Sequence, residues 1–120
     1  MKYEFLSGYC TQKPGATKDF QAEWQAYRYF VGGKMFLMEG GDKEETPIIT
    51  LKLEPLKGEL LRKQYPGIVI PGHYMNKVHW NSIYRHGDVP DELVKECIDE
   101  SYRLIFSALT KKTQVEILNS

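Results

Sequence analysis

Hydrophobic residues recur along the chain at two spacings, and each spacing predicts a different kind of element. Steps of three and four residues over 2–10, and again after Pro90, predict an amphipathic helix towards each end of the chain. Between them, β-branched and aromatic runs predict five strands, at residues 24–31, 34–39, 47–53, 68–70 and 80–84. The helix after Pro90 is the clearest element, because its apolar positions form one stripe: Leu93, Val94, Cys97, Ile98, Leu104, Ile105 and Ala108.

Turn residues separate these runs and define their connections. Gly32-Gly33 lies between two strand-like runs and predicts a tight hairpin, since both turn positions need a positive φ. Pro55 favours the start of a second helix, which Tyr65-Pro66-Gly67 ends. The segment 113–118 predicts a last, short helical turn.

The predicted order of elements is helix, three strands, helix, two strands, helix. Strands joined by tight turns are antiparallel, and runs of strands between helices are typical of an α+β domain. We therefore expect one domain over residues 1–120, in two layers: a five-stranded antiparallel sheet with helices on one face, the last of them lying across the sheet. The chain has neither GxGxxG nor GxxxxGK[ST], so a phosphate-binding loop is not expected.

Charge is unevenly distributed along a chain that is neutral overall. It carries 16 Lys and Arg against 16 Asp and Glu, and this balance disfavours a dedicated, tight nucleic-acid binder. Residues 57–86, however, hold five basic side chains against Glu59 alone, a net of +4, together with all three histidines. Any surface that contacts phosphates is therefore expected in this basic section.

The two cysteines, Cys10 and Cys97, form no CxxC motif and predict no disulfide framework. With no signal peptide and no apolar run near the roughly 20 residues of a membrane span, we expect a cytoplasmic protein without membrane contact. Cys97 belongs to the apolar stripe, so we expect its thiol to be buried and unreactive. We favour a monomer.

Reactive side chains are not spaced as catalysis or metal binding requires. His73, His79 and His86 are far apart, with no carboxylate or thiol between them and Asp88, whereas a zinc site needs converging ligands. The acids near Pro90 are typical of a helix start, not of a general-acid/base pair. We expect no metal, no cofactor and no enzyme activity.

Side chains suited to nucleic acid occur in the basic section. Lys, Arg and Asn contact phosphates, and aromatic rings stack on single-stranded bases. The section supplies these types as Arg62, Lys63, Asn76, Lys77, Trp80, Tyr84 and Arg85. Structural roles fit some of them equally well: Trp80 in the core, Asn76 in a turn, and Lys77 covering apolar surface with its stem.

Seven blocks span nearly the whole chain in a recognisable order: YCTQKPGAT, GGKMF, TLKLEP, LLRKQYPGI, PGHYMNKVHWNSIY, GDVPDEL and ESYRLI. Together they resemble the MmcQ/YjbR family of small bacterial proteins, and MNKVHW with the downstream SY is the most specific part. The resemblance implies an antiparallel α+β fold and DNA binding, with no catalytic residue set. Segment 24–31 departs from the family pattern and carries no implied role. The matching polar positions are Lys52, Arg62, Asn76, Lys77, His79, Trp80, Ser101 and Tyr102.

Two hypotheses for function stay open at this point. One is weak binding of DNA or single-stranded nucleic acid, and the other is a noncatalytic module for a protein partner or a small ligand. In the first, Arg62, Lys77 and Arg85 share one basic patch, and Tyr102 directs its hydroxyl to the Asn76–Lys77 turn. The candidate nucleic-acid-binding residues are Lys52, Arg62, Lys63, Asn76, Lys77, His79, Arg85 and Tyr102.

Overall fold

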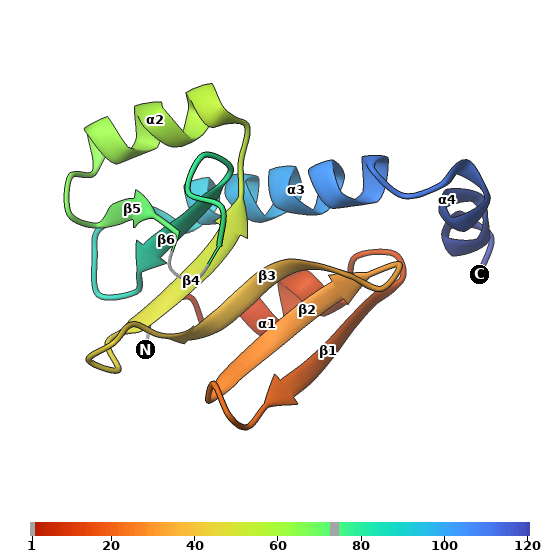
Figure 1. Ribbon diagram of the computed structural model, residues 1–120, viewed down its shortest axis with the longest axis horizontal. Helices are drawn as coiled ribbons and strands as arrows, with labels where there is room; N and C mark the ends of the chain where they lie inside the picture. The colour runs from red at the N-terminus through yellow and green to blue at the C-terminus, as the bar shows by residue number, and fades with distance from the viewer. Residues whose placement is uncertain (1, 73–74) are drawn as a thin grey trace.

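The computed structural model describes residues 2–72 and 75–120, which form one antiparallel sheet with helices packed against it (Figure 1). The strands are β1 (Ala16–Gln21), β2 (Ala26–Val31), β3 (Lys34–Gly41), β4 (Pro47–Lys52), β5 (Val69–Pro71) and β6 (Trp80–Tyr84). The helices are α1 (Leu6–Thr11), α2 (Pro55–Gln64), α3 (Asp91–Ser107) and α4 (Lys111–Leu118). The spatial order of the strands is β1-β2-β3-β4-β6-β5, and every neighbouring pair is antiparallel.

The α+β class and the antiparallel sheet are confirmed, but the predicted five strands and their order are wrong. The sheet has six strands, because residues 16–21 form an edge strand that pairs with β2 along its whole length. Four of its six residues are exposed and none is buried, so β1 lacks the hydrophobic alternation by which a strand is recognised in sequence. The predicted last turn is also longer, an eight-residue helix.

The hairpin predicted at Gly32-Gly33 connects β2 to β3. Both glycines have a positive φ, +57° for Gly32 and +80° for Gly33, which side chains other than glycine rarely adopt. A Cβ on Gly32 would lie 2.6 Å from the Leu109 side chain, so the turn also packs closely against the segment after α3. Gly33 faces open space.

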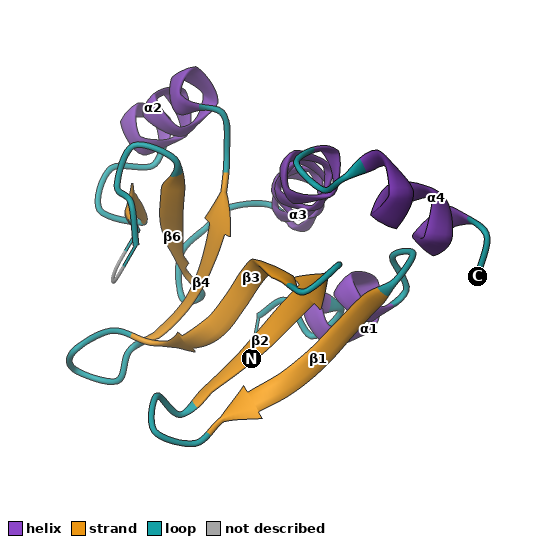
Figure 2. Ribbon diagram, turned by 45° about the vertical axis from the view of Figure 1, so that its right-hand side comes forward, coloured by secondary structure: helices purple, strands orange, loops and turns teal. Residues whose placement is uncertain are grey.

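The hydrophobic core lies between the sheet and the helices α1 and α3. Tyr29, Leu37 and Ile49 on three adjacent strands are fully buried on the inner face of the sheet, and α3 contacts all three strands. Burying an aliphatic or aromatic side chain of this size contributes about 1.5–3 kcal/mol. Figure 2 shows α3 beside the strands of the sheet, and Cys97 on this helix is fully buried, as predicted.

A register shift in β3 determines which residues lie on the face of the sheet that points away from the core. Arg28 pairs with Met38 and Phe30 pairs with Met35, so Phe36 is an extra residue in the ladder. Met35 and Met38, three residues apart, therefore share a face instead of pointing to opposite faces. We call this the outer face; Ala26 and Ile48 also belong to it.

Among the described residues, none of the helices has both the length and the apolar character that crossing a bilayer requires.

Candidate ligand-binding site

The predicted basic patch of Arg62, Lys77 and Arg85 is wrong for Arg85. Its side chain is 8% exposed, and Nη1 donates to Oε2 of Glu39 at 2.6 Å. Nη2 donates to the carbonyl oxygen of Lys2 at 2.7 Å. Arg85 follows the last residue of β6 and Lys77 precedes the first residue of this strand, so the two lie at opposite ends of β6. The Arg85 guanidinium thus joins the N-terminal segment to the sheet and is not available at the surface.

Three other predicted site residues have structural contacts. Arg62 Nη1 donates to the Oδ1 atom of buried Asn81, which ties α2 to β6. The Asn76 side chain accepts a hydrogen bond from the Val78 amide at 2.8 Å, the turn role that the sequence left open. Tyr102 donates its hydroxyl to the carbonyl of Pro14 at 2.5 Å, so its predicted direction toward the Asn76–Lys77 turn is wrong.

The remaining predicted residues are only partly brought together. Lys52 and Trp80 are Cα partners at the end of the β4–β6 ladder, and His79 directly precedes this pair. Trp80 is half-buried and packs against the core, whereas Lys77 is exposed in the turn before β6. Lys63 is exposed on α2. The structure therefore pairs Lys52 with Trp80 and places Lys77 in the turn before this pair.

The histidines do not form a metal site in the part of the chain that the structure describes. His73, with Tyr74, lies outside the described residues, His79 is half-buried and His86 is exposed. Within residues 2–72 and 75–120, no three His, Cys, Asp or Glu side chains are grouped closely enough to hold a metal ion.

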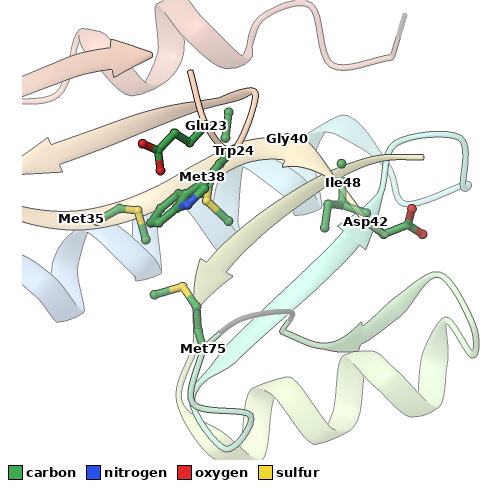
Figure 3. Close-up of a pocket in the computed structure, with 10 residues that line it drawn as sticks. Glu23, Trp24, Met35, Met38, Gly40, Asp42, Ile48 and Met75 are labelled. Atoms are coloured by element: carbon green, nitrogen blue, oxygen red, sulfur yellow. The ribbon is translucent and has the colours of Figure 1, made fainter. Parts of the chain in front are cut away.

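A pocket on the outer face gathers apolar side chains from distant parts of the sequence (Figure 3). Its volume is about 440 Å³, within the range of about 300–1,000 Å³ that is typical of ligand pockets. Trp24 and Glu23 lie on one side, and Met75 approaches from the segment before β6. The lining residues are Glu23, Trp24, Ala26, Met35, Met38, Gly40, Gly41, Asp42, Ile48 and Met75.

Small residues on neighbouring strands explain why the sheet is hollowed here. Gly40 pairs with Ile48, and a Cβ on Gly40 would lie 3.1 Å from the Cβ of Ala26 on the other side. An alanine and a glycine thus lie side by side where larger side chains would fill the surface. The taller side chains of Trp24 and Met38 then form walls around this floor.

Trp24 occupies the turn between β1 and β2 and is 57% exposed. The Arg28 guanidinium lies 5.6 Å from its ring centre, within the range of a cation–π contact. The Nε and Nη2 atoms of Arg28 also donate to the two carboxylate oxygens of Asp19 at 2.9 and 2.6 Å. This bidentate ion pair holds Arg28 against one side of the indole, and Asp19 balances the positive charge of Arg28.

Among the described residues, the two charged side chains that line the pocket are both acids. Asp42 Oδ1 accepts from the amides of Glu44 and Thr46 at 2.9 Å, and its Oδ2 accepts from the Tyr84 hydroxyl at 2.7 Å. The hydrogen bond to Asp42 raises the pKa of Tyr84, with burial adding to the effect. Glu23 is exposed, and within the described chain its carboxylate has no ion-pair partner.

Sequence reasoning named none of the pocket residues as a candidate site residue, although Met75 lies within the basic section. The basic section directed attention to residues 57–86, and segment 24–31 was set aside because it departs from the family pattern. One signal was present: three of the chain's four methionines line the pocket, together with one of its two tryptophans. Methionine is flexible and polarizable and is common at binding surfaces, but its placement on one face could not be read from the sequence.

Comparison with known proteins supports the family resemblance. Residues 11–104 match the family model YjbR. Uncharacterized protein YjbR of Escherichia coli (strain K12) is 34% identical over 107 residues, which cover 89% of this chain and 89% of the relative. Uncharacterized protein YbdF of Escherichia coli O157:H7 is 33% identical over 98 residues, covering 82% of this chain and 77% of the relative.

Solved structures show the same fold. The crystal structure of Deinococcus radiodurans protein DR2400, of family-model domain DUF419, has a TM-score of 0.85 at 29% identity. It covers 97% of this chain, which in turn covers 87% of that structure. A Pseudomonas syringae protein has a TM-score of 0.73 at 19% identity, with 88% of this chain and 99% of that one covered. On the match of its residues 11–104 and on these relatives, the chain belongs to the YjbR family.

Proposed function

We propose that this protein is a noncatalytic binding module and that the pocket on the outer face holds a small, largely apolar ligand. The observation that carries the proposal is the convergence of Trp24 and three methionines on one hollow of about 440 Å³. Trp24 is 57% exposed, and its apolar surface is removed from water only when another molecule covers it. Covering it with a ligand is therefore favourable.

The chemistry of the lining supports binding more than catalysis. Among the described residues it consists of thioethers, an indole, aliphatic groups and two carboxylates, with no histidine, cysteine, serine or lysine. Thioether side chains adapt to ligands of different shape, because methionine is unbranched and rotates freely. Such a lining offers apolar contact area, and within the described chain its two carboxylates lack a neighbouring histidine, cysteine, serine or lysine with which they could share acid–base or nucleophilic catalysis.

Calorimetric titration with 1-octanol tests this proposal, because the alcohol is apolar, uncharged and small enough for the pocket. We expect saturable binding to the unmodified protein. Trp24→Ala should weaken binding at least roughly tenfold, which corresponds to about 1.4 kcal/mol. Phe20→Ala is the matched control: Phe20 is 47% exposed on the same hairpin but does not line the pocket, so binding should be unchanged. Equal loss in both variants, or no binding at all, would contradict the proposal.

A second candidate, weak binding of single-stranded nucleic acid, has one observation in its favour. Lys52 and Trp80 are cross-strand partners, and the exposed Lys77 precedes them by a single turn. Two cations beside a half-buried aromatic ring offer phosphate contacts and a ring edge for a base. Arg85 is excluded from this surface by its burial.

Fluorescence anisotropy with short oligonucleotides across a salt series tests this second candidate. If Lys52 and Lys77 each contact one phosphate, log K should fall with log salt at a slope of about −1.4 for single strands. Lys77→Ala should halve that slope and weaken all sequences alike. Lys112→Ala, an exposed lysine on α4, serves as the control and should leave the slope unchanged. No binding at low salt would exclude the candidate.

A further inference from the structure

The charges around the pocket restrict which apolar ligands it can favour. Glu23 and Asp42 line it, and no Lys, Arg or His does so among the described residues. Arg28 is close to Trp24, but its bidentate ion pair with Asp19 already balances its positive charge. An anionic ligand would therefore meet the like charge of Glu23, whose carboxylate has no ion-pair partner within the described chain, and a cation would meet opposite charge there.

The two carboxylates differ in their capacity for a new partner. The oxygens of Asp42 already accept hydrogen bonds from two amides and from Tyr84. Glu23 is exposed, and Figure 3 shows its carboxylate on the same side of the pocket as the Trp24 indole. A positive charge placed there would have a carboxylate and an aromatic ring as neighbours, the two groups that proteins use to hold organic cations.

We propose that the ligand is a small organic cation, with an apolar body in the methionine-lined hollow and a single ammonium-type charge beside Glu23 and Trp24. This rests on the proposed function of the pocket and adds the charge of its ligand. The apolar body covers Met35, Met38 and Met75, and the polarizable thioethers suit it whether it is aliphatic or aromatic. The ammonium group stays near solvent at the rim, so its desolvation cost is small.

Three probes with the same eight-carbon chain and different head groups separate charge from apolar contact: n-octylammonium, 1-octanol and octanoate. Calorimetric titration of the unmodified protein should give the tightest binding for octylammonium. We expect it to exceed that of octanol by roughly tenfold, about 1.4 kcal/mol, and octanoate to bind more weakly than octanol. The probes must be used well below the concentrations at which they aggregate.

Glu23→Gln identifies the carboxylate responsible. This substitution should reduce the preference for octylammonium over octanol several-fold and leave octanol binding unchanged. Glu44→Gln removes the same charge from an exposed residue of the neighbouring loop that does not line the pocket, and should leave the preference intact. Both residues are exposed, so neither substitution threatens the fold.

The outcomes distinguish this inference from the proposed function. If octanol and octylammonium bind equally, or if Glu23→Gln keeps the full preference, the inference is wrong while the apolar pocket stands. If octanoate binds most tightly, the sign of the charge is wrong. If none of the three probes binds, both the inference and the proposed function are wrong.

Discussion

At the scale of single residues, Arg85 shows how burial changes the meaning of a charge. Its guanidinium is bound by Glu39 and by the carbonyl oxygens of Lys2 and Tyr3. Glu39 also accepts a hydrogen bond from the Tyr29 hydroxyl at 2.9 Å, which connects the pair to the core. Counting charges along the sequence placed Arg85 in a basic surface, because sequence alone does not show which arginine is covered.

We predict that Arg85→Ala destabilises the fold by about 3–5 kcal/mol, because it leaves the partly buried Glu39 carboxylate and two backbone carbonyls without their partner. Urea denaturation followed by circular dichroism measures the change. Arg103→Ala, an exposed arginine on α3, is the matched control and should change stability by less than about 0.5 kcal/mol. Equal effects of the two substitutions would mean that the Arg85 contacts contribute nothing.

At the scale of elements, local signals predicted the connections well. Gly32-Gly33 gave the β2–β3 hairpin, and Pro55 and Pro90 gave the starts of α2 and α3, because these residues restrict the backbone directly. Segment 80–84 was also predicted at its observed bounds. Each of these signals acts over a few residues and needs no knowledge of the remaining chain.

Two features of the sheet around the pocket could not be predicted in this way. β1 is an edge strand with no buried residue, so its pairing with β2 leaves no hydrophobic pattern. The register shift at Phe36 places Met35 and Met38 on one face, although strict alternation would separate them. Both features depend on how strands pair, and pairing is a non-local property that one sequence does not display.

The hairpin glycines offer a test of element packing. Gly33→Ala should cost about 1–2 kcal/mol, because alanine must adopt a positive φ, although its Cβ would meet open space. Gly32→Ala should cost more, since its Cβ would also lie 2.6 Å from the Leu109 side chain, which must move. Thermal and urea denaturation of the two variants measure the difference. A Gly33→Ala variant that is the less stable of the two would contradict the packing of the hairpin against Leu109.

At the scale of the whole molecule, the two buried thiols couple stability to alkaline pH. Burial raises the pKa of both Cys10 and Cys97 from 9.0 to about 12. Above pH 9 the unfolded chain therefore loses thiol protons that the folded protein keeps. The free energy of unfolding should fall as pH rises from about 9 to 12, by up to about 1.4 kcal/mol per pH unit for each thiol.

Urea midpoints measured from pH 8 to pH 11 test this dependence. In Cys97→Ala the free energy of unfolding should decline less steeply with pH, because one of the two titrating thiols is absent. Some decline should remain, because burial and Asp99 also raise the pKa of Tyr9 to about 12. Native protein should also react slowly with thiol reagents at pH 8, since both thiols are fully buried. If the pH dependence of stability is the same in Cys97→Ala as in the unmodified protein, the Cys97 thiol has the same pKa in the folded and unfolded states, which would contradict the prediction.

The pocket is likewise a property of the whole molecule. It is assembled from the β1–β2 turn, β2, β3, β4 and the segment that contains Met75, which lies 27 residues after Ile48 in the sequence. The family resemblance predicted the fold, but it implied no role for residues 24–31. Only the folded sheet brings Trp24, on the first turn, to the same hollow as Met75.

Methyl NMR of protein labelled with ¹³C at its methionine and isoleucine methyl groups tests the central claim most directly. Met35, Met38, Met75 and Ile48 line the pocket, whereas Ile98, on α3, is fully buried in the core and does not line it. Titration with octylammonium, and separately with octanol, should shift the four pocket methyl signals along one saturable curve and leave that of Ile98 in place. Shifts confined to other methyl groups, or no saturable shift of the pocket methyl groups with either probe, would contradict the assignment of this pocket as the ligand site.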